Sequence, residues 1–240
     1  MDKKETTILE NYSKVMQRIE QAAQSVGRDP AEITLVVVTK GQPLSVVQTL
    51  SEIGVKHLGE NRVEEGIQKV TSYAGQTDIQ WHMIGHVQSR KARQVSEHFD
   101  FFHALDRIKL ARRLDRSLEE LNRRLPTLLQ FNVSGEMSKF GWLADDEDNW
   151  HTLFPEISQI LELKNLEVQG VMTIAPYSPN PEDARPVFTR LRNLRDYLAV
   201  QFPQVEWNHL SMGMSADFEI GVQEGATMVR IGSAILGERI

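Results

Sequence analysis

The stretch Ile33-Thr-Leu-Val-Val-Val-Thr-Lys40-Gly-Gln-Pro43 is a run of apolar and β-branched residues that ends in a lysine. Its apolar residues do not alternate with polar ones, which is typical of a strand buried on both faces in a parallel sheet covered by helices. Ligands of α/β proteins bind at the carboxyl ends of the strands, where a desolvated lysine can attack a carbonyl group. Lys40 is therefore the first candidate for chemistry. The alternative is a lysine that marks the end of a strand and extends into solvent.

Seven further strand-like segments follow, and segments of helical periodicity separate them. We expect strands over residues 33–40, 55–61, 79–85, 99–105, 127–133, 166–174, 207–213 and 227–236. We expect helices over residues 7–27, 43–53, 63–73, 88–97, 106–124, 145–164, 184–201 and 215–224. A repeat of about thirty residues predicts an α/β fold, a closed (β/α)8 TIM barrel with an extra N-terminal helix that covers the place of a missing last helix. An open doubly wound sheet is the alternative.

The composition limits the classes of function. The 240 residues fit one barrel domain over residues 1–240, and the net charge of −6 argues against nucleic acid or an acidic membrane as a partner. There is no cysteine, so disulfides and thiolate metal sites are excluded. The N-terminal stretch is polar and amphipathic, unlike a signal peptide, and no stretch approaches a membrane span. We expect a cytoplasmic protein with a small ligand.

Residues from different strands would meet at the carboxyl end of such a barrel. They are Lys40 from the first strand, Glu60 and Asn61 from the second, Gly85 and His86 from the third, Ser211 to Ser215 from the seventh, and Arg230 to Ser233 from the eighth. The last two segments combine small residues with hydroxyl groups, so backbone N–H groups can approach a phosphate there. Barrel phosphate sites use the loops after strands seven and eight. The alternative is a plain turn with Ser215 as a helix N-cap.

Arg230 lies inside an apolar strand, where a charge that cannot be neutralised needs a partner. The partner is either Glu60, in an ion pair inside the barrel, or an acceptor on the ring of a ligand. A lysine for an aldehyde, an arginine for a ring acceptor and small-residue loops for a phosphate together match pyridoxal phosphate.

The other polar residues carry less information. His82 and His86 are four residues apart, but they flank the end of a strand with Gly85 between them rather than lying on a helix, so we expect no metal site. We expect four further histidines to satisfy hydrogen bonds in the core, and these are His57, His98, His103 and His209. No Walker sequence or Gly-x-Gly-x-x-Gly motif indicates a nucleotide.

Several ordered motifs together resemble the pyridoxal-phosphate homeostasis protein family. They are Val37-Val-Thr-Lys40, Gly59-Glu-Asn61, Trp81-His-Met-Ile-Gly85 with Gln88-Ser-Arg-Lys91, Ser138-Lys139-x-Gly141, Leu210-Ser-Met-Gly-Met-Ser-Ala-Asp217 and Val229-Arg-Ile-Gly-Ser233. The resemblance spans almost the whole chain. It implies a barrel similar to the N-terminal domain of alanine racemase. Gly41 and Gln42 stand where the family often has Thr-Lys or a similar pair, so the outer mouth is expected to differ.

The resemblance also implies roles for individual residues. Lys40 would hold pyridoxal 5′-phosphate as an internal aldimine, a Schiff base, and Arg230 would face the pyridine nitrogen. The phosphate would lie among Ser211, Gly213, Met214, Ser215, Gly232 and Ser233, while Asn61 and the stretch from Met83 to Gly85 would line the pocket.

An arginine at the ring nitrogen weakens the ring as an electron sink. In addition, racemases with this barrel use a tyrosine from a second domain, and no tyrosine follows Tyr197 here. We therefore expect a non-catalytic protein that serves vitamin B6 and amino-acid homeostasis, a monomer, with pyridoxal-phosphate enzymes or a regulatory protein as potential partners. The alternatives are an amino-acid racemase that uses His86 or another pocket group as its second acid–base residue and a Schiff-base aldolase that acts on a sugar phosphate.

Overall fold

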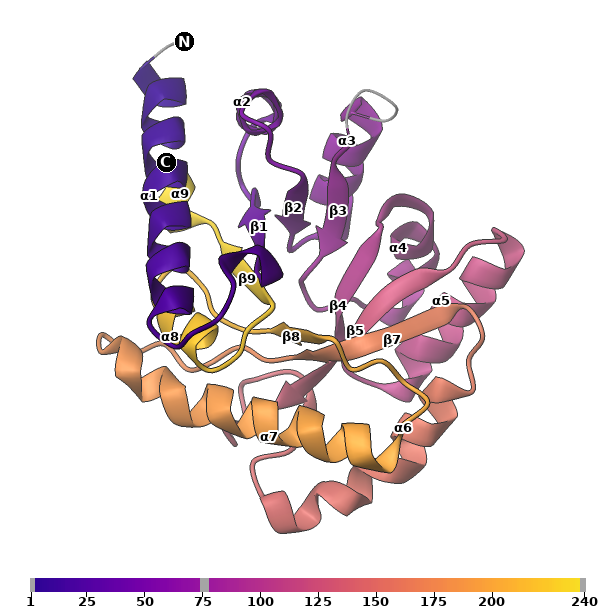
Figure 1. Ribbon diagram of the computed structural model, residues 1–240. Coiled ribbons are helices and arrows are strands. Elements are labelled where there is room, and N and C mark those ends of the chain that lie inside the picture. The colour runs from indigo at the N-terminus through magenta and orange to yellow at the C-terminus, as the bar shows by residue number, and fades with distance from the viewer. Residues whose placement is uncertain (1–2, 74–77, 238–240) are drawn as a thin grey trace.

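The structure is a computed structural model that describes residues 3–73 and 78–237. Within these residues, eight parallel strands close into a barrel in the order β1-β2-β3-β4-β5-β7-β8-β9, and β9 pairs back with β1 (Figure 1). The pairing of β4 with β5 closes the circle. The predicted (β/α)8 barrel is confirmed, and the open sheet is wrong.

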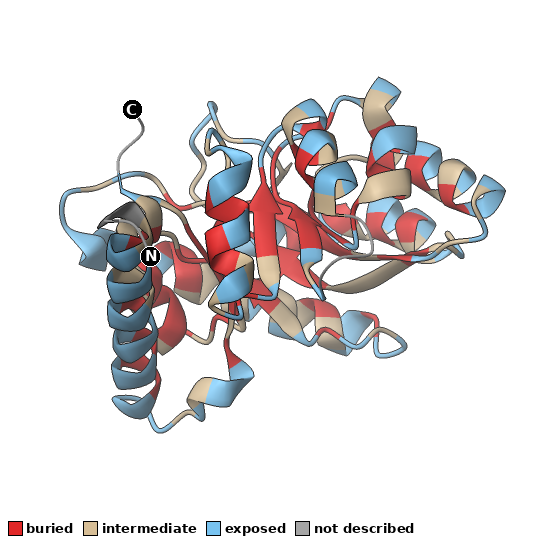
Figure 2. Ribbon diagram, turned by 90° about the horizontal axis from the view of Figure 1, so that it is seen from above, coloured by how far each residue is buried: buried red, intermediate tan, exposed pale blue. Residues whose placement is uncertain are grey.

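The strands are β1 (Thr34–Val38), β2 (His57–Glu60), β3 (Gln80–Met83), β4 (Phe101–Leu105), β5 (Leu125–Asn132), β6 (Trp142–Leu143), β7 (Leu166–Met172), β8 (His209–Ser211) and β9 (Met228–Ile231). Among these, the two-residue β6 is an addition that pairs with the end of β5. Buried residues concentrate on the strands and on the inner faces of the helices, so the core lies between the sheet and its helical layer as well as inside the barrel (Figure 2).

The α-helices are α1 (Lys3–Gln24), α2 (Leu44–Glu52), α3 (Val63–Tyr73), α4 (Ala92–His98), α5 (Ile108–Glu120), α6 (Phe154–Leu161), α7 (Arg185–Gln201), α8 (Phe218–Gln223) and α9 (Ser233–Leu236). Short 3-10 helices are η1 (Pro30–Glu32), η2 (Ser89–Lys91), η3 (Glu147–Leu153) and η4 (Pro181–Ala184). In the part of the chain that the structure describes, no helix has the length and apolar character needed to cross a membrane.

Two predicted boundaries are wrong for identifiable reasons. The last strand was expected to reach residue 236, but β9 ends at Ile231. Gly232 adopts a helical backbone conformation, its carbonyl accepts the N–H of Ile235, and α9 begins at Ser233. The helix expected to begin at residue 145 starts as η3, and α-helical geometry begins only at Phe154. By contrast, Gly54 ends α2 as expected, with a φ of 84°.

The N-terminal helix α1 lies on the outside of the barrel beside α8, α9 and α2 (Figure 1). Arg18 on α1 forms an ion pair with Glu219 on α8 at 2.7 Å, and Asn11 Nδ2 donates to the carbonyl of Ile235 on α9 at 3.2 Å. The helix before the first strand therefore covers the side of the barrel where β1 meets β9, as the sequence predicts.

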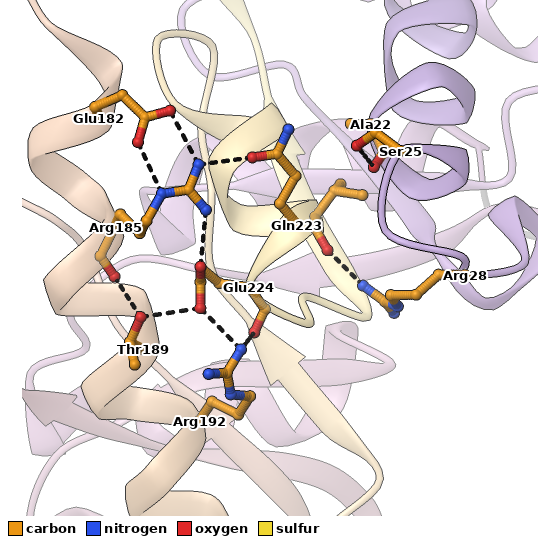
Figure 3. A network of polar contacts seen from close by, with 10 residues as sticks. Ala22, Ser25, Arg28, Glu182, Arg185, Thr189, Arg192, Gln223 and Glu224 are labelled. Carbon is orange, nitrogen blue, oxygen red and sulfur yellow. Dashed lines mark hydrogen bonds and ion pairs between the residues drawn. The ribbon is translucent and has the colours of Figure 1, made fainter.

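A polar network centred on Glu224 joins α7 to the end of α8 (Figure 3). The Glu224 carboxylate accepts from Arg185 Nη1, Arg192 Nη1 and Thr189 Oγ1 at distances of 2.8, 2.8 and 2.9 Å. Arg185 also contacts the exposed Glu182, at 2.7 Å. The side chain of Glu224 is 11% exposed, so water cannot easily replace it as the acceptor.

We predict that Glu224→Ala lowers the free energy of unfolding by about 2 kcal/mol, because three donors lose a partly buried acceptor. Denaturant unfolding followed by circular dichroism measures the change. Glu182→Ala is the matched control, since it removes an exposed partner of the same arginine and should change stability less. Equal effects of the two variants would contradict the central role of Glu224.

Candidate functional site

A pocket of about 720 Å³ opens at the carboxyl ends of the strands. It is lined by Val38, Lys40, Gln42, Asn61, Ile84, Ile174, Tyr177, Met214, Ser215, Ala216, Arg230, Gly232, Ser233, Leu236 and Gly237. Its walls thus combine apolar side chains with a lysine, an arginine and two serines. A pocket with a few converging polar groups in an apolar lining is the usual form of a small-molecule site.

The backbone around Lys40 is held on both sides. The carbonyl of Thr39 accepts from Lys69 Nζ at 2.7 Å, and the N–H of Thr39 donates to the carbonyl of Gly59 at 3.0 Å. On the other side, the N–H of Gly41 donates to the Glu65 carboxylate. Gly41 has a φ of 73°, a conformation that glycine adopts without strain. The turn therefore presents the half-buried Lys40 to the pocket from a fixed backbone.

Behind this turn, Lys69 and Glu60 form a buried ion pair at 2.7 Å. Lys69 also contacts Glu65 at 2.9 Å, and Thr39 Oγ1 donates to the Glu60 carboxylate. Burial raises the pKa of Glu60, although the hydrogen bonds from Lys69 and Thr39 act in the opposite direction. The ion pair considered between Glu60 and Arg230 is wrong, because Glu60 instead pairs with Lys69 on α3.

Arg230 is a buried cation in the floor of the pocket. Its Nη1 donates to Ser211 Oγ at 2.5 Å and its Nη2 donates to the carbonyl of Thr173 at 2.8 Å. Burial lowers the pKa of Arg230 to about 10, and the negative charge of Asp217 partly opposes this. The guanidinium therefore stays charged at neutral pH. It can face a neutral ring acceptor, and its charge favours an anionic ligand.

The turns after β8 and β9 meet at Ser215. Its Oγ accepts from the backbone N–H groups of Gly232 and Ala234, each at 3.3 Å. A side chain at Gly232 would place its Cβ 3.1 Å from the carbonyl oxygen of Val38, so this close approach favours glycine. Small residues, a hydroxyl and backbone donors fit a phosphate group here. The interpretation of Ser215 as a helix N-cap is wrong, because α8 begins at Phe218 with Asp217 as its N-cap.

Seven of the predicted site residues lie together in the pocket lining. They are Lys40, Asn61, Met214, Ser215, Arg230, Gly232 and Ser233. The other four predicted residues lie behind the lining. Ser211 supports Arg230, and Gly85 packs so closely on Asn61 that a Cβ would lie 2.1 Å from the Asn61 carbonyl oxygen. Met83 is fully buried while its neighbour Ile84 lines the pocket, and Gly213 packs on Phe218.

Sequence reasoning missed seven lining residues, namely Val38, Gln42, Ile174, Tyr177, Ala216, Leu236 and Gly237. Each of these residues is the last residue of a strand or lies in the segment that follows one. Tyr177 belongs to the turn-rich stretch after β7 and is 85% exposed. Its position directly after a barrel strand was the signal that could have found it.

The histidines have different surroundings. His86 is outside the pocket lining; its Nδ1 lies 2.7 Å from Asp106 Oδ2, and its ring stacks on Phe140 with centroids 3.9 Å apart. His103 is fully buried inside the barrel and hydrogen-bonded, as expected, and His82 beside it is buried as well. The expectation for His98 is wrong, because its Nδ1 lies 3.0 Å from the Gln94 carbonyl oxygen of its own helix, outside the core. Among residues 3–73 and 78–237, no group of three acidic, histidine or cysteine side chains could hold a metal ion.

Comparison with known proteins identifies the family. The sequence matches the alanine racemase N-terminal domain over residues 11–239. It is 40% identical to the pyridoxal phosphate homeostasis protein of Aquifex aeolicus over 230 residues, which are 96% of this chain and 97% of that protein. The chain belongs to the pyridoxal phosphate homeostasis protein family.

Solved structures agree with this family assignment. The structure of PipY from Synechococcus elongatus with PLP bound matches with a TM-score of 0.78 and 34% identity, covering 92% of this chain and all 100% of PipY. Alanine racemase from Clostridium difficile has a TM-score of 0.70 at 16% identity, covering 95% of this chain and 56% of the racemase. The racemase therefore shares the barrel fold.

We predict that the substitution Lys69→Met lowers the free energy of unfolding of this protein by about 3–5 kcal/mol, because it leaves the Glu60 carboxylate buried without its cation. Chemical denaturation measures the loss. Adding Glu60→Gln removes the uncompensated charge and should recover part of it. A loss below about 1 kcal/mol, or no recovery in the double variant, would contradict the buried ion pair.

We predict that acid destabilises the fold through the buried histidines. Burial lowers the pKa of His82 to about 3, whereas an unfolded histidine titrates near about 6.5. Between these pH values the unfolded state binds more protons than the folded state. The contribution of His82 to the free energy of unfolding is therefore complete above about pH 6.5 and falls by about 1.4 kcal/mol for each pH unit below it. Unfolding at pH 7, 6 and 5 measures the slope. His82→Phe should reduce it, and an unchanged slope would contradict the assignment.

Proposed function

We propose that this protein binds pyridoxal 5′-phosphate reversibly, with Lys40 as the residue that holds the cofactor covalently through its aldehyde. The observation that carries the proposal is that Lys40 and Arg230 line one pocket with Ser215 and Gly232. An amine, a cation for a ring acceptor and a small-residue turn for a phosphate are thus combined at one barrel mouth. The binding of PLP by PipY, a relative of similar length, supports this assignment.

We further propose a role in vitamin B6 and amino-acid homeostasis without efficient catalysis. Bound pyridoxal phosphate supplies an electron sink for chemistry at amino acids. Arg230 remains a cation, and as a hydrogen-bond donor it disfavours a proton on a ring nitrogen that it faces. This weakens the sink.

The surroundings of His86 argue in the same direction. This residue, the candidate for a racemase acid–base group, is held by Asp106 and Phe140 outside the pocket lining. A racemase that used His86 as its second acid–base group would need the ring to leave both contacts.

We predict that the protein retains a visible absorption band after incubation with pyridoxal phosphate and gel filtration, and that Lys40→Ala abolishes the band, because the covalent link needs the amine of Lys40. The absorption spectra of the two purified proteins provide the measurement. Lys56→Ala is the matched control, since this exposed lysine precedes β2 at the opposite end of the barrel and should leave the band intact.

The contradicting outcomes are distinct. A band that persists in Lys40→Ala would place the covalent link on another lysine. Failure of the unchanged protein to retain any cofactor would favour a Schiff-base aldolase instead, which borohydride trapping with a sugar phosphate would detect. Turnover of an amino acid at ordinary enzyme rates by the loaded protein would contradict the non-catalytic role and favour a racemase.

A further inference from the structure

A continuous series of hydrogen-bonded side chains crosses the interior of the barrel. His57 Nδ1 lies 3.0 Å from His82 Nε2, and His82 Nδ1 lies 2.9 Å from His103 Nε2. His103 Nδ1 in turn lies 2.9 Å from Ser211 Oγ, which accepts from Arg230 Nη1. These groups come from β2, β3, β4, β8 and β9. Interiors of such barrels are usually packed with branched apolar side chains, so the series requires an explanation.

The rings in this series are neutral. Burial lowers the pKa of His82 to about 3 and the pKa of His103 well below its usual value. Burial and the nearby Lys56 also lower the pKa of His57. A neutral imidazole has one N–H donor and one acceptor nitrogen. In a series of such rings, the tautomer of each ring is fixed by that of its neighbour, so all hydrogen bonds run in the same direction.

Arg230 sets this direction. A guanidinium only donates, so Ser211 Oγ must accept from it. Within the described part of the chain, the other contact of Ser211 Oγ is His103 Nδ1. If His103 donated as well, the hydroxyl hydrogen of Ser211 would be buried without an acceptor, which is costly. The hydroxyl therefore donates to His103 Nδ1.

The remaining protons follow from this assignment. His103 donates from Nε2 to His82 Nδ1, and His82 donates from Nε2 to His57 Nδ1. The Nε2–H of His57 is left at the partly exposed, amino-terminal end of β2. Every buried nitrogen of His82 and His103 then has a partner of the correct kind. The arrangement agrees with the burial pattern, in which the one partly exposed ring is the terminal one.

We propose that His57, His82 and His103 form with Ser211 an ordered relay, all three rings being Nε2–H tautomers, and that this relay positions Arg230 for the ring acceptor of its ligand. The three histidines are positioning residues, because none of them lines the pocket. The proposal rests on the proposed function only where it says that Arg230 faces a pyridine nitrogen. The order of the tautomers is a property of the chain itself.

Packing alone does not account for the series. His82 stacks on Phe101, with ring centroids 5.2 Å apart and an interplanar angle of 19°. A phenylalanine could make the same stacking contact without burying two polar nitrogens. His209 is the useful comparison, because it also contacts Phe101 but its Nδ1 lies near Thr227 Oγ1, at 3.3 Å, outside the relay. His209 thus provides an interior histidine that packs in a similar way but does not belong to the hydrogen-bonded series.

The first test is nitrogen-15 NMR of the histidine rings in the full chain without cofactor, at pH 7. We expect the Nε2 resonances of His57, His82 and His103 to be those of protonated nitrogens and the Nδ1 resonances those of unprotonated ones. A protonated Nδ1 on His82 or His103 would overturn the proposal. Because no cofactor is present, this result is independent of whether the protein binds pyridoxal phosphate.

The second test uses His57, which is the last ring of the relay when it is followed from Arg230. His57→Leu removes the acceptor for His82, whereas the side-chain oxygen of His57→Asn can take the place of Nδ1. We expect His57→Leu to shift the ring resonances of His103 and to weaken pyridoxal phosphate binding by about tenfold, since a buried donor loses its partner. We expect His57→Asn to have His103 resonances and an affinity for pyridoxal phosphate close to those of the unchanged protein. Affinity is measured by titration of the absorption band.

His209→Leu is the control for a general loss of packing, and it should leave the resonances of His103 and the affinity close to those of the unchanged protein. The proposal is overturned if His57→Leu leaves both readouts unchanged, or if His57→Asn behaves as His57→Leu does. If the unchanged protein binds no pyridoxal phosphate while the tautomer order is as expected, the proposed function fails and the relay stands.

Discussion

A positive charge that cannot easily be neutralised lies inside this barrel, and the site depends on how it is held. Arg230 is in the last strand, and in the described structure its hydrogen-bond partners are a serine hydroxyl and a backbone carbonyl. Neither partner cancels the charge. Burial without a carboxylate in direct contact keeps a positive potential at the floor of the pocket, which suits an anionic ligand with a ring acceptor. Burying this charge without a full counter-ion lowers stability, and a role of the charge in ligand binding accounts for it.

Lys40, which follows the neighbouring strand β1, is supported by a separate polar arrangement between β2 and α3. Lys69 neutralises Glu60 and at the same time binds the carbonyl next to Lys40. The cation and the amine therefore come from neighbouring strands, β9 and β1, and each is supported by its own buried polar group. The glycine and serine turns after β8 and β9 complete the pocket between them, because the closed barrel brings β9 beside β1.

The strand segments and the position of Lys40 could be predicted because a buried parallel strand leaves a clear signal in its run of apolar residues, whereas the pairing order of the strands leaves none. Arg230 was predictable for the opposite reason, as a charge within such a run. Its true partners were not predictable, since Ser211 and Thr173 are distant in sequence and meet it only through the register of the barrel. Glu60 was misplaced as its partner because residues alternate between the two faces of a strand, and here the carboxylate faces α3. The apolar pocket residue Ile174 lacked any signal beyond its place near a strand end.

The position of α1 has a consequence for how the chain acquires its structure. This helix precedes every strand of the barrel in the chain, yet it packs mainly on α8 and α9, and its hydrogen bonds to them join residues 201 and 224 positions apart. Most of the native surface that covers the apolar face of α1 therefore comes from elements that lie far from it in the sequence. Contacts of such long sequence separation slow folding, because a large loop must close before they contribute stability.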